Sequence, residues 1–318
     1  MTYAPNIIDL SRVPFPDAIE TLSVETLLAQ FIARFKTLWD AERIKDPTLP
    51  AWDVDPLEVD PVIVIGQAWA WYRMLDRQRV NDAVKSVFAV TAKGTNLANI
   101  AARVNVERKL IRAAVDDKLA IYESDAALLR RYLMSFDRPS AGSRDRYLFE
   151  AWSAWPQGED LEGNPIGMGD CRINGWAIHK RRGDTHIVVM GPAGRTPTSG
   201  ELAVIRAAVL SDYVKPEATF VSVIAAKRAV YSARFSIDVP FGPDVELVRQ
   251  ETVARIRRAT DARTFINAQI PANYLSSAVY GANVLEARDL NPVEIEADPY
   301  TAPVCIGIEV TASVVDPE

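Results

Sequence analysis

The amino-acid sequence predicts an α+β multidomain protein. We expect a helical N-terminal half and a C-terminal half built from small α+β layers with an antiparallel or mixed sheet. Two observations predict this class. Apolar residues recur at spacings of three and four through most of the first 155 positions, which is the helical period. From His186 onward, short apolar runs and strict alternation follow, and these are typical of strands. The length of 318 residues suits two or three domains.

The N-terminal segment predicts two long helices joined by an irregular connector. Residues 1–16 contain three prolines and predict an extended arm. A helix is expected over 22–40 with Ser23 as its N-cap. After a connector rich in proline and acidic residues, Asp60 and Pro61 begin a helix expected to reach residue 93. Gly94 is expected to end it in the left-handed conformation, and Thr95 or Asn96 to cap the next helix.

The second of these long helices carries two stripes. Its apolar stripe runs along one side and its polar stripe repeats every four residues along another. The apolar stripe contains Ile65, Trp69, Tyr72, Leu75, Val80, Val84 and Val87, and the polar stripe contains Arg73, Arg77, Asn81 and Lys85. A helix with both stripes is expected to contact more than one neighbouring element or chain.

The middle of the chain predicts further short helices and an insert. Residues 107–121 are ambiguous, and a short strand is one of the alternatives. Ser124 and Ser143 are each expected to cap a helix. The glycine-rich segment 156–185 indicates a long loop or an irregular β-hairpin at the surface.

The C-terminal half predicts strands alternating with helices. Thr198 and Glu201 form a capping box for a helix after the strand that begins at His186. Strands are expected around 219–226 and 229–241, then helices over about 244–268 and 273–280. Two further strands are expected to close the chain. Their order indicates one or two sheets with helices on one face.

Composition limits the function classes. Lys+Arg number 36 and Asp+Glu 42, and the net charge of −6 argues against a dedicated nucleic-acid binder. No run of about 20 apolar residues predicts membrane insertion. The N-terminus lacks the pattern of a secretory signal, so we expect folding and assembly in the cytoplasm. The two cysteines, Cys171 and Cys305, are expected to be reduced thiols.

Signs of catalytic chemistry are few. His179 and His186 lie across a turn-like segment with Asp184 between them and Cys171 nearby. In a hairpin the histidines could face each other, which makes a metal-dependent hydrolase using His179, Asp184 and His186 the alternative function. Their spacing matches no closed zinc pattern, and an ordinary surface loop is the simpler interpretation. We expect no cofactor, no metal and no catalytic residues.

The tryptophans indicate a different role. Trp69 and Trp71 are two positions apart, so on a helix their side chains point about 200° apart. They cannot both face one core, so one of them is exposed or is buried by a second partner. Large aromatic residues and arginines are frequent at the centres of protein–protein interfaces. The other interpretation is a helix buried on two sides within its own domain.

Several motifs occur together in one order. The run containing Arg77, Arg79, Asn81 and Ala83 precedes a second run with Ala92, Gly94, Leu97, Ile100 and Ala101. ESDAALLRRYL, the AGS turn at 141–143, the IIDLSRVPFPDAIETLSVETLLAQ start and VKPEATFVSV after the T-x-x-E helix complete the set. This set resembles the baseplate J-like proteins, which are wedge components of contractile phage tails and related injection particles. The resemblance covers most of the chain.

The resemblance implies a structural role without enzymatic activity. Residues 1–106 would form an arm and a helical core-bundle region, 107–193 a middle helical region with the glycine-rich insert, and 194–318 a dimerisation region. Two copies would join a tail protein I-like partner in each of six wedges around the central hub and spike, contacting a gp25-like sheath initiator. The expected location is the baseplate of the virion tail, after assembly in the bacterial cytoplasm, and a conformational switch would trigger sheath contraction.

The resemblance also directs attention to the two long N-terminal helices, and to the second above all. The side chains expected at the partner interface of the core bundle are Trp39, Trp69, Trp71, Tyr72, Arg73, Arg77, Arg79, Asn81, Val84 and Val87. The apolar stripe would face one neighbour, and the polar stripe would set the register, because buried Arg and Asn require specific partners.

Overall fold

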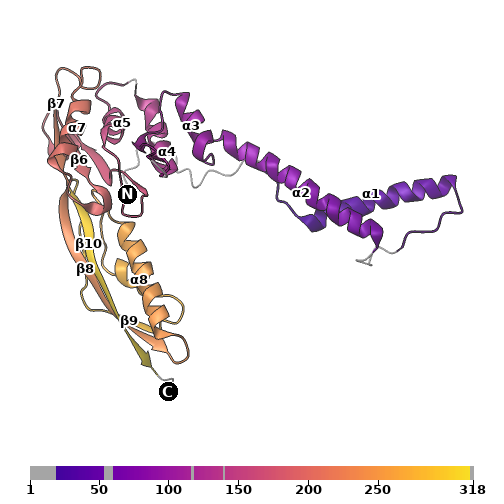
Figure 1. Ribbon diagram of the computed structural model, residues 1–318. Coiled ribbons are helices and arrows are strands. Elements are labelled where there is room, and N and C mark those ends of the chain that lie inside the picture. The colour runs from indigo at the N-terminus through magenta and orange to yellow at the C-terminus, as the bar shows by residue number, and fades with distance from the viewer. Residues whose placement is uncertain (1–18, 54–59, 116–117, 139, 316–318) are drawn as a thin grey trace. The chain divides into compact units, whose positions relative to one another are not determined.

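The computed structural model describes residues 19–53, 60–115, 118–138 and 140–315. The described residues divide into two compact units, one within residues 19–100 and the other within residues 101–315. The predicted class is confirmed, because long helices occupy the N-terminal part and small mixed sheets the C-terminal part (Figure 1). The expected arm at residues 1–16 lies outside the described residues.

The first unit is a pair of long helices followed by a short one. Helix α1 is Val24–Lys45 and helix α2 is Pro61–Val87. The Ser23 side chain accepts a hydrogen bond from the Thr26 N–H, and the Asp60 carboxylate accepts one from the Val62 N–H at 2.8 Å. Both helix starts are therefore set by N-caps that the sequence predicts.

The helix ends differ from the predicted ones. Helix α1 runs five residues beyond Asp40, and α2 ends at Val87, where Phe88 adopts an extended conformation. Gly94 does take a left-handed φ of 54°, but it stands at the beginning of helix α3, Gly94–Ala102. The left-handed glycine therefore closes the turn of residues 88–93, which separates α2 from α3.

The second unit begins with a small hairpin and two helices. Strands β1 (Leu110–Arg112) and β2 (Ile121–Tyr122) pair antiparallel, which resolves the ambiguous segment as strand. Helices α4 (Asp125–Met134) and α5 (Arg144–Ala154) follow, capped by Ser124 and Ser143 as predicted, with a 3-10 turn (Ser135–Asp137) after α4.

In the glycine-rich insert, the predicted irregular β-hairpin describes the structure better than the predicted long loop, because two short strands pair antiparallel there. The insert contains the two-residue strands β3 (Gly158–Glu159) and β4 (Pro165–Ile166), strand β5 (Asp170–Asn174) and the single turn α6 (Trp176–His179). Strand β5 pairs antiparallel with β6 (Asp184–Met190), which pairs parallel with β7 (Phe220–Ala225). Helix α7 (Ser199–Val209), after a 3-10 turn (Pro192–Gly194), connects β6 to β7 and starts with the predicted capping box.

The second mixed sheet has the strand order β10-β8-β9. Strand β8 is Lys227–Pro240, β9 is Glu286–Asp289 and β10 is Thr301–Val315. Helix α8 (Val245–Asp261) ends seven residues before the predicted end, and α9 (Tyr274–Val279) follows it. These helices cover one face of the sheet (Figure 1). The core between them is formed by Tyr231, Ala233, Phe235, Ile237, Val239, Val248, Ile256, Ile270, Leu275, Val279 and Val310.

Candidate assembly interface

One side of helix α2 packs against α1. Ile63, Gly66 and Ala70 are buried there, at helical spacings of three and four. A Cβ atom placed on Gly66 would lie 2.7 Å from the Phe31 ring and 2.9 Å from a Leu28 methyl group. The two helices therefore approach closely because position 66 has no side chain.

The apolar stripe of α2 lies on a different side and faces outward within this chain. At 100° per residue, five of its side chains fall within about 80° of arc. We call them the α2 apolar face, and their exposed fractions are Ile65 61%, Trp69 38%, Tyr72 65%, Val80 59% and Val87 67%. Large apolar side chains exposed along one line of a helix indicate a surface that another chain covers.

A polar pair interrupts this face. Asp76 lies in its middle, between the Ile65–Tyr72 part and the Val80–Val87 part, and its carboxylate is 3.4 Å from the Arg73 guanidinium. Leu75 lies to one side of the line, with Trp71 and Val64, which are also exposed. The expected stripe is thus two neighbouring apolar strips rather than one.

The tryptophans named from the sequence have different environments. Trp69 contacts Phe31 of α1, with ring centroids 5.4 Å apart, and Trp71 meets Tyr72 edge to face at 5.0 Å. Trp71 is half exposed and Trp69 is slightly less so. The third, Trp39, is half-buried and its indole N–H donates to the Pro50 carbonyl at 3.0 Å. Trp39 therefore holds the segment that follows α1.

Two residues of the polar stripe make contacts within the chain. The Asn81 amide donates to the Glu20 carbonyl at 2.9 Å and accepts from the Glu20 N–H at 3.1 Å. The Arg77 guanidinium pairs with the Glu20 carboxylate at 2.8 Å. Asn81 is buried at 5% exposure, so this pair of hydrogen bonds attaches the segment before α1 to α2. Arg73 and Arg79 are exposed, and Val84 is half-buried.

The two histidines do face each other. Their ring centroids are 4.6 Å apart, and burial, together with the neighbouring His179 and Arg181, lowers the pKa of His186. His186 contacts the Tyr300 hydroxyl at 2.9 Å and the Arg181 guanidinium at 2.5 Å, and His179 contacts the Asn174 carbonyl at 3.2 Å. Protein groups thus already surround both imidazoles.

The remaining expected ligand is engaged elsewhere. The Asp184 carboxylate pairs with Arg181 at 3.1 Å. Among the described residues, no group of three or more His, Cys, Asp or Glu side chains is arranged to hold a metal ion. The hydrolase alternative at His179, Asp184 and His186 therefore lacks its ligand set in this part of the chain.

Two further findings concern the cysteine side chains and the character of the helices. Both cysteines are free thiols, and burial raises the pKa of Cys171 well above its usual value. Cys171 is therefore held as a neutral thiol inside the β5–β6–β7 layer. None of the helices described here has the length and apolar character required to cross a membrane.

Sequence reasoning missed two residues of this region. Glu20 is the partner of both Arg77 and Asn81, yet it lies 57 and 61 positions away, so no local pattern identifies it. Gly66 was also missed, although the small or apolar series Ile63, Gly66, Ala70 has the spacing of a helix–helix contact. This spacing of small and apolar residues is the sequence pattern from which the close contact with α1 could have been predicted.

Comparison with known proteins agrees with the described elements. Residues 58–115, which hold all of α2 and α3, match the model of the baseplate J-like N-terminal domain. Across 298 residues, 92% of this chain and 90% of the relative, the sequence is 27% identical to baseplate protein J of Escherichia phage P2. The similarity thus extends over both units, and the predicted resemblance to the baseplate J-like proteins is confirmed.

Proposed function

We propose that this chain is a structural wedge subunit of a contractile-tail baseplate, and that the α2 apolar face packs against helices of neighbouring subunits. Its relationship to baseplate protein J supports a structural role in the baseplate of a virion tail, assembled with other baseplate components. The observation that carries the interface is the exposure of Ile65, Tyr72, Val80 and Val87 along one line of a 27-residue helix.

The energetics favour burial of this face. Covering a fully exposed large apolar side chain contributes roughly 1.5–3 kcal/mol. These five side chains are between 38% and 67% exposed, so covering them offsets part of the cost of association. The Arg73–Asp76 pair lies in the middle of the face. A charged pair at a helix–helix seam fixes the register, because only one alignment gives it partners. Arg79 is exposed beside the face and would supply a further polar contact.

The finer assignments follow from the family resemblance. Two copies of this chain would join one tail protein I-like partner in each of six wedges around the hub and spike, with a gp25-like sheath initiator linking the ring to the sheath. The 194–318 region would pair between copies, and rearrangement of the ring would trigger contraction. The hinge positions would lie between the described elements, where glycine and proline gather, as at residues 191–200.

The sharpest test places a charge on the α2 apolar face. Ile65→Glu adds a carboxylate where burial is proposed, so we expect subunit association to weaken at least about tenfold, the equivalent of ~1.4 kcal/mol. Sedimentation of the purified chain, alone and with its wedge partner, measures this. Incorporation into tails, scored by complementation, measures the same loss in the particle.

Gln67→Glu is the matched control. Gln67 is exposed on the opposite side of α2, and the same charge there should leave association within about twofold of the wild type. Both variants should melt like the wild-type chain, since neither side chain is buried within it. Wild-type association and tail incorporation by Ile65→Glu would rule out the proposed interface.

A further inference from the structure

Strand β10 has one unpaired edge. It runs for 15 residues at the end of the sheet and pairs with β8 along one side only. Along the other side, from residue 302 to 315, its peptide groups form no backbone hydrogen bond with any described residue. A long open edge of this kind is a template for another strand.

The two edges of this sheet differ in their protection. The opposite edge strand, β9, has four residues, and Glu286, Arg288 and Asp289 among them are charged. The β10 sequence TAPVCIGIEVTASVV carries a single charge, at Glu309. Short length and charges discourage strand addition, so β9 is protected on both counts, whereas β10 is long, carries one charge and is interrupted by Pro303 and by a bulge after Cys305.

A β-bulge increases the number of free peptide groups. The register shifts between Cys305 and Gly307, which pair with Tyr231 and Ser232, so Ile306 has no partner on β8. Its side chain is 66% exposed. Ser232, which pairs with Gly307, turns its carbonyl toward Asn291 and away from β10. In a parallel ladder Gly307 therefore faces β8, and the peptide group of the next residue, Ile308, lies on the open side.

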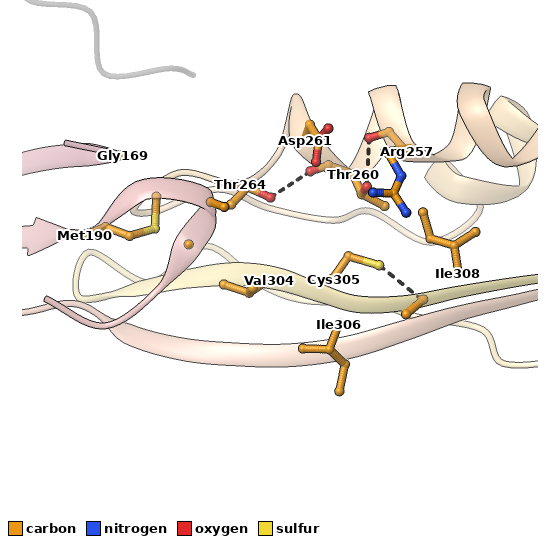
Figure 2. Close-up of a pocket in the computed structure, with 13 residues that line it drawn as sticks. Gly169, Met190, Arg257, Thr260, Asp261, Thr264, Val304, Cys305, Ile306 and Ile308 are labelled. Atoms are coloured by element: carbon orange, nitrogen blue, oxygen red, sulfur yellow. Dashed lines mark hydrogen bonds between the residues drawn. The ribbon is translucent and has the colours of Figure 1, made fainter. Parts of the chain in front are cut away.

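A groove runs beside this segment. Its volume is about 540 Å³, and five consecutive residues, Val304–Ile308, line it (Figure 2). Successive side chains of a strand point to opposite faces, so a groove on one face would be lined by every second residue. Because consecutive residues line this groove, it follows the edge of the strand. The end of α8, the residue Thr264 that follows it, and the turn at Ala193 and Gly194 also line the groove.

We propose that this groove binds an extended segment of a separate protein chain, which adds as a strand to the open edge of β10. The backbone of the segment would hydrogen-bond to the open-side peptide groups of residues 305–308. Its apolar residues on one face would contact Ile308, on the α8 side of the strand, and those on the other face would contact Ile306. Arg257 and Asp261 also line the groove and would bind polar groups of the segment.

The geometry favours a lone segment over a second copy of β10. In a second copy of this chain, β10 would still be paired with β8 and covered by α8. A strand that carries a helix on one face is about 10 Å thicker than a single extended segment. The groove is bounded by the end of α8 and by the turn of residues 190–194, so it suits the thinner occupant. This inference requires an assembly but does not use the α2 apolar face.

The test compares the full chain with the assembled tail. Amide hydrogen exchange at residues 305–308 should slow at least about tenfold upon assembly. Cys305 lines the groove, and the other cysteine is buried. A thiol-reactive photo-crosslinker on Cys305 should therefore join this chain to a short extended peptide of a different tail protein.

The matched variants are Ile306→Pro and Ile306→Thr. Proline removes the free N–H, whereas threonine keeps it, and neither change touches a residue paired with β8. Ile306→Pro should abolish the crosslink and the protection, while Ile306→Thr keeps both. A crosslink to residues 301–315 of a second copy, equal exchange in the free and assembled chain, or a normal crosslink in Ile306→Pro would each overturn the proposal. Failure of Ile65→Glu to affect association would leave these results unchanged.

Discussion

At the scale of single residues, the side-chain amide of Asn81 makes the hydrogen bonds that a peptide group of a neighbouring strand would make. It both donates to and accepts from the peptide groups of Glu20. A buried asparagine is tolerated only when its hydrogen bonds are made, and here one residue supplies both partners. The Arg77–Glu20 pair is more exposed and contributes less. The polar stripe therefore has an intramolecular role at its C-terminal part.

Replacing Asn81 tests this role. Asn81→Ala removes two hydrogen bonds, each contributing roughly 0.5–1.5 kcal/mol, so the segment before α1 should detach more often from α2. We expect the Glu20 amide to exchange about tenfold faster, as measured by hydrogen exchange on the full chain. Arg79→Ala, an exposed change on the same helix, should leave that rate unchanged. An unaltered rate in Asn81→Ala would disprove the attachment.

At the scale of elements, the α1–α2 contact depends on a missing side chain. Gly66 is unfavourable for a helix by about 1 kcal/mol relative to alanine. It occurs inside α2 because the Phe31 ring and Leu28 occupy the space where a Cβ would stand. Close approach of α1 then buries Ile63 and Ala70 and leaves the α2 apolar face on another side of the helix.

Alanine at this position should therefore destabilise the pair of helices. Gly66→Ala improves helix propensity, but the resulting overlap costs about 1–3 kcal/mol, so we expect a net loss of stability. Urea unfolding followed by far-UV circular dichroism measures it. Gly200→Ala is the matched control, because Gly200 lies in α7 with open space around its Cβ position, and it should be neutral or stabilising. Equal effects of the two changes would refute the steric explanation.

At the scale of the whole molecule, the chain combines two compact units that offer different surfaces. The unit within residues 19–100 exposes a helix side, and the unit within residues 101–315 exposes a strand edge and its groove. Helix sides associate by apolar burial, whereas strand edges associate through the backbone. A subunit with both kinds of surface can bind more than one neighbour at once.

Copy number in the particle follows from the proposed wedge. Imaging of assembled tails should show two copies of this chain in each six-fold repeat, with α2 of both copies in one helical bundle. The copy number is what the resemblance to the baseplate J-like proteins implies, and the place of α2 in the bundle follows because its apolar face needs at least one partner helix to exclude water. One copy per repeat, or α2 exposed to solvent in the assembled tail, would contradict the proposal.

Local features were predictable from the sequence. The caps at Ser23, Asp60 and Thr198 were correctly predicted, because a cap involves residues three positions apart or fewer. The fold class was also predictable, since the change from helical to strand periodicity is a local pattern. The ends of α1, α2 and α8 were wrong, because helix ends depend on what the following segment contacts.

By itself, the sequence determined the long helices, the main strands of the C-terminal half and the apolar stripe on α2, but not the short elements within residues 107–122 and 156–183. Only the tertiary structure decided which side of α2 is covered, because that depends on Phe31 and Leu28 meeting Gly66 from another helix. It also decided that Asn81 binds Glu20 and that β10 lies at a sheet edge. These are contacts between residues distant in sequence, and apolar periodicity is the same whether a stripe faces its own core or a neighbouring chain.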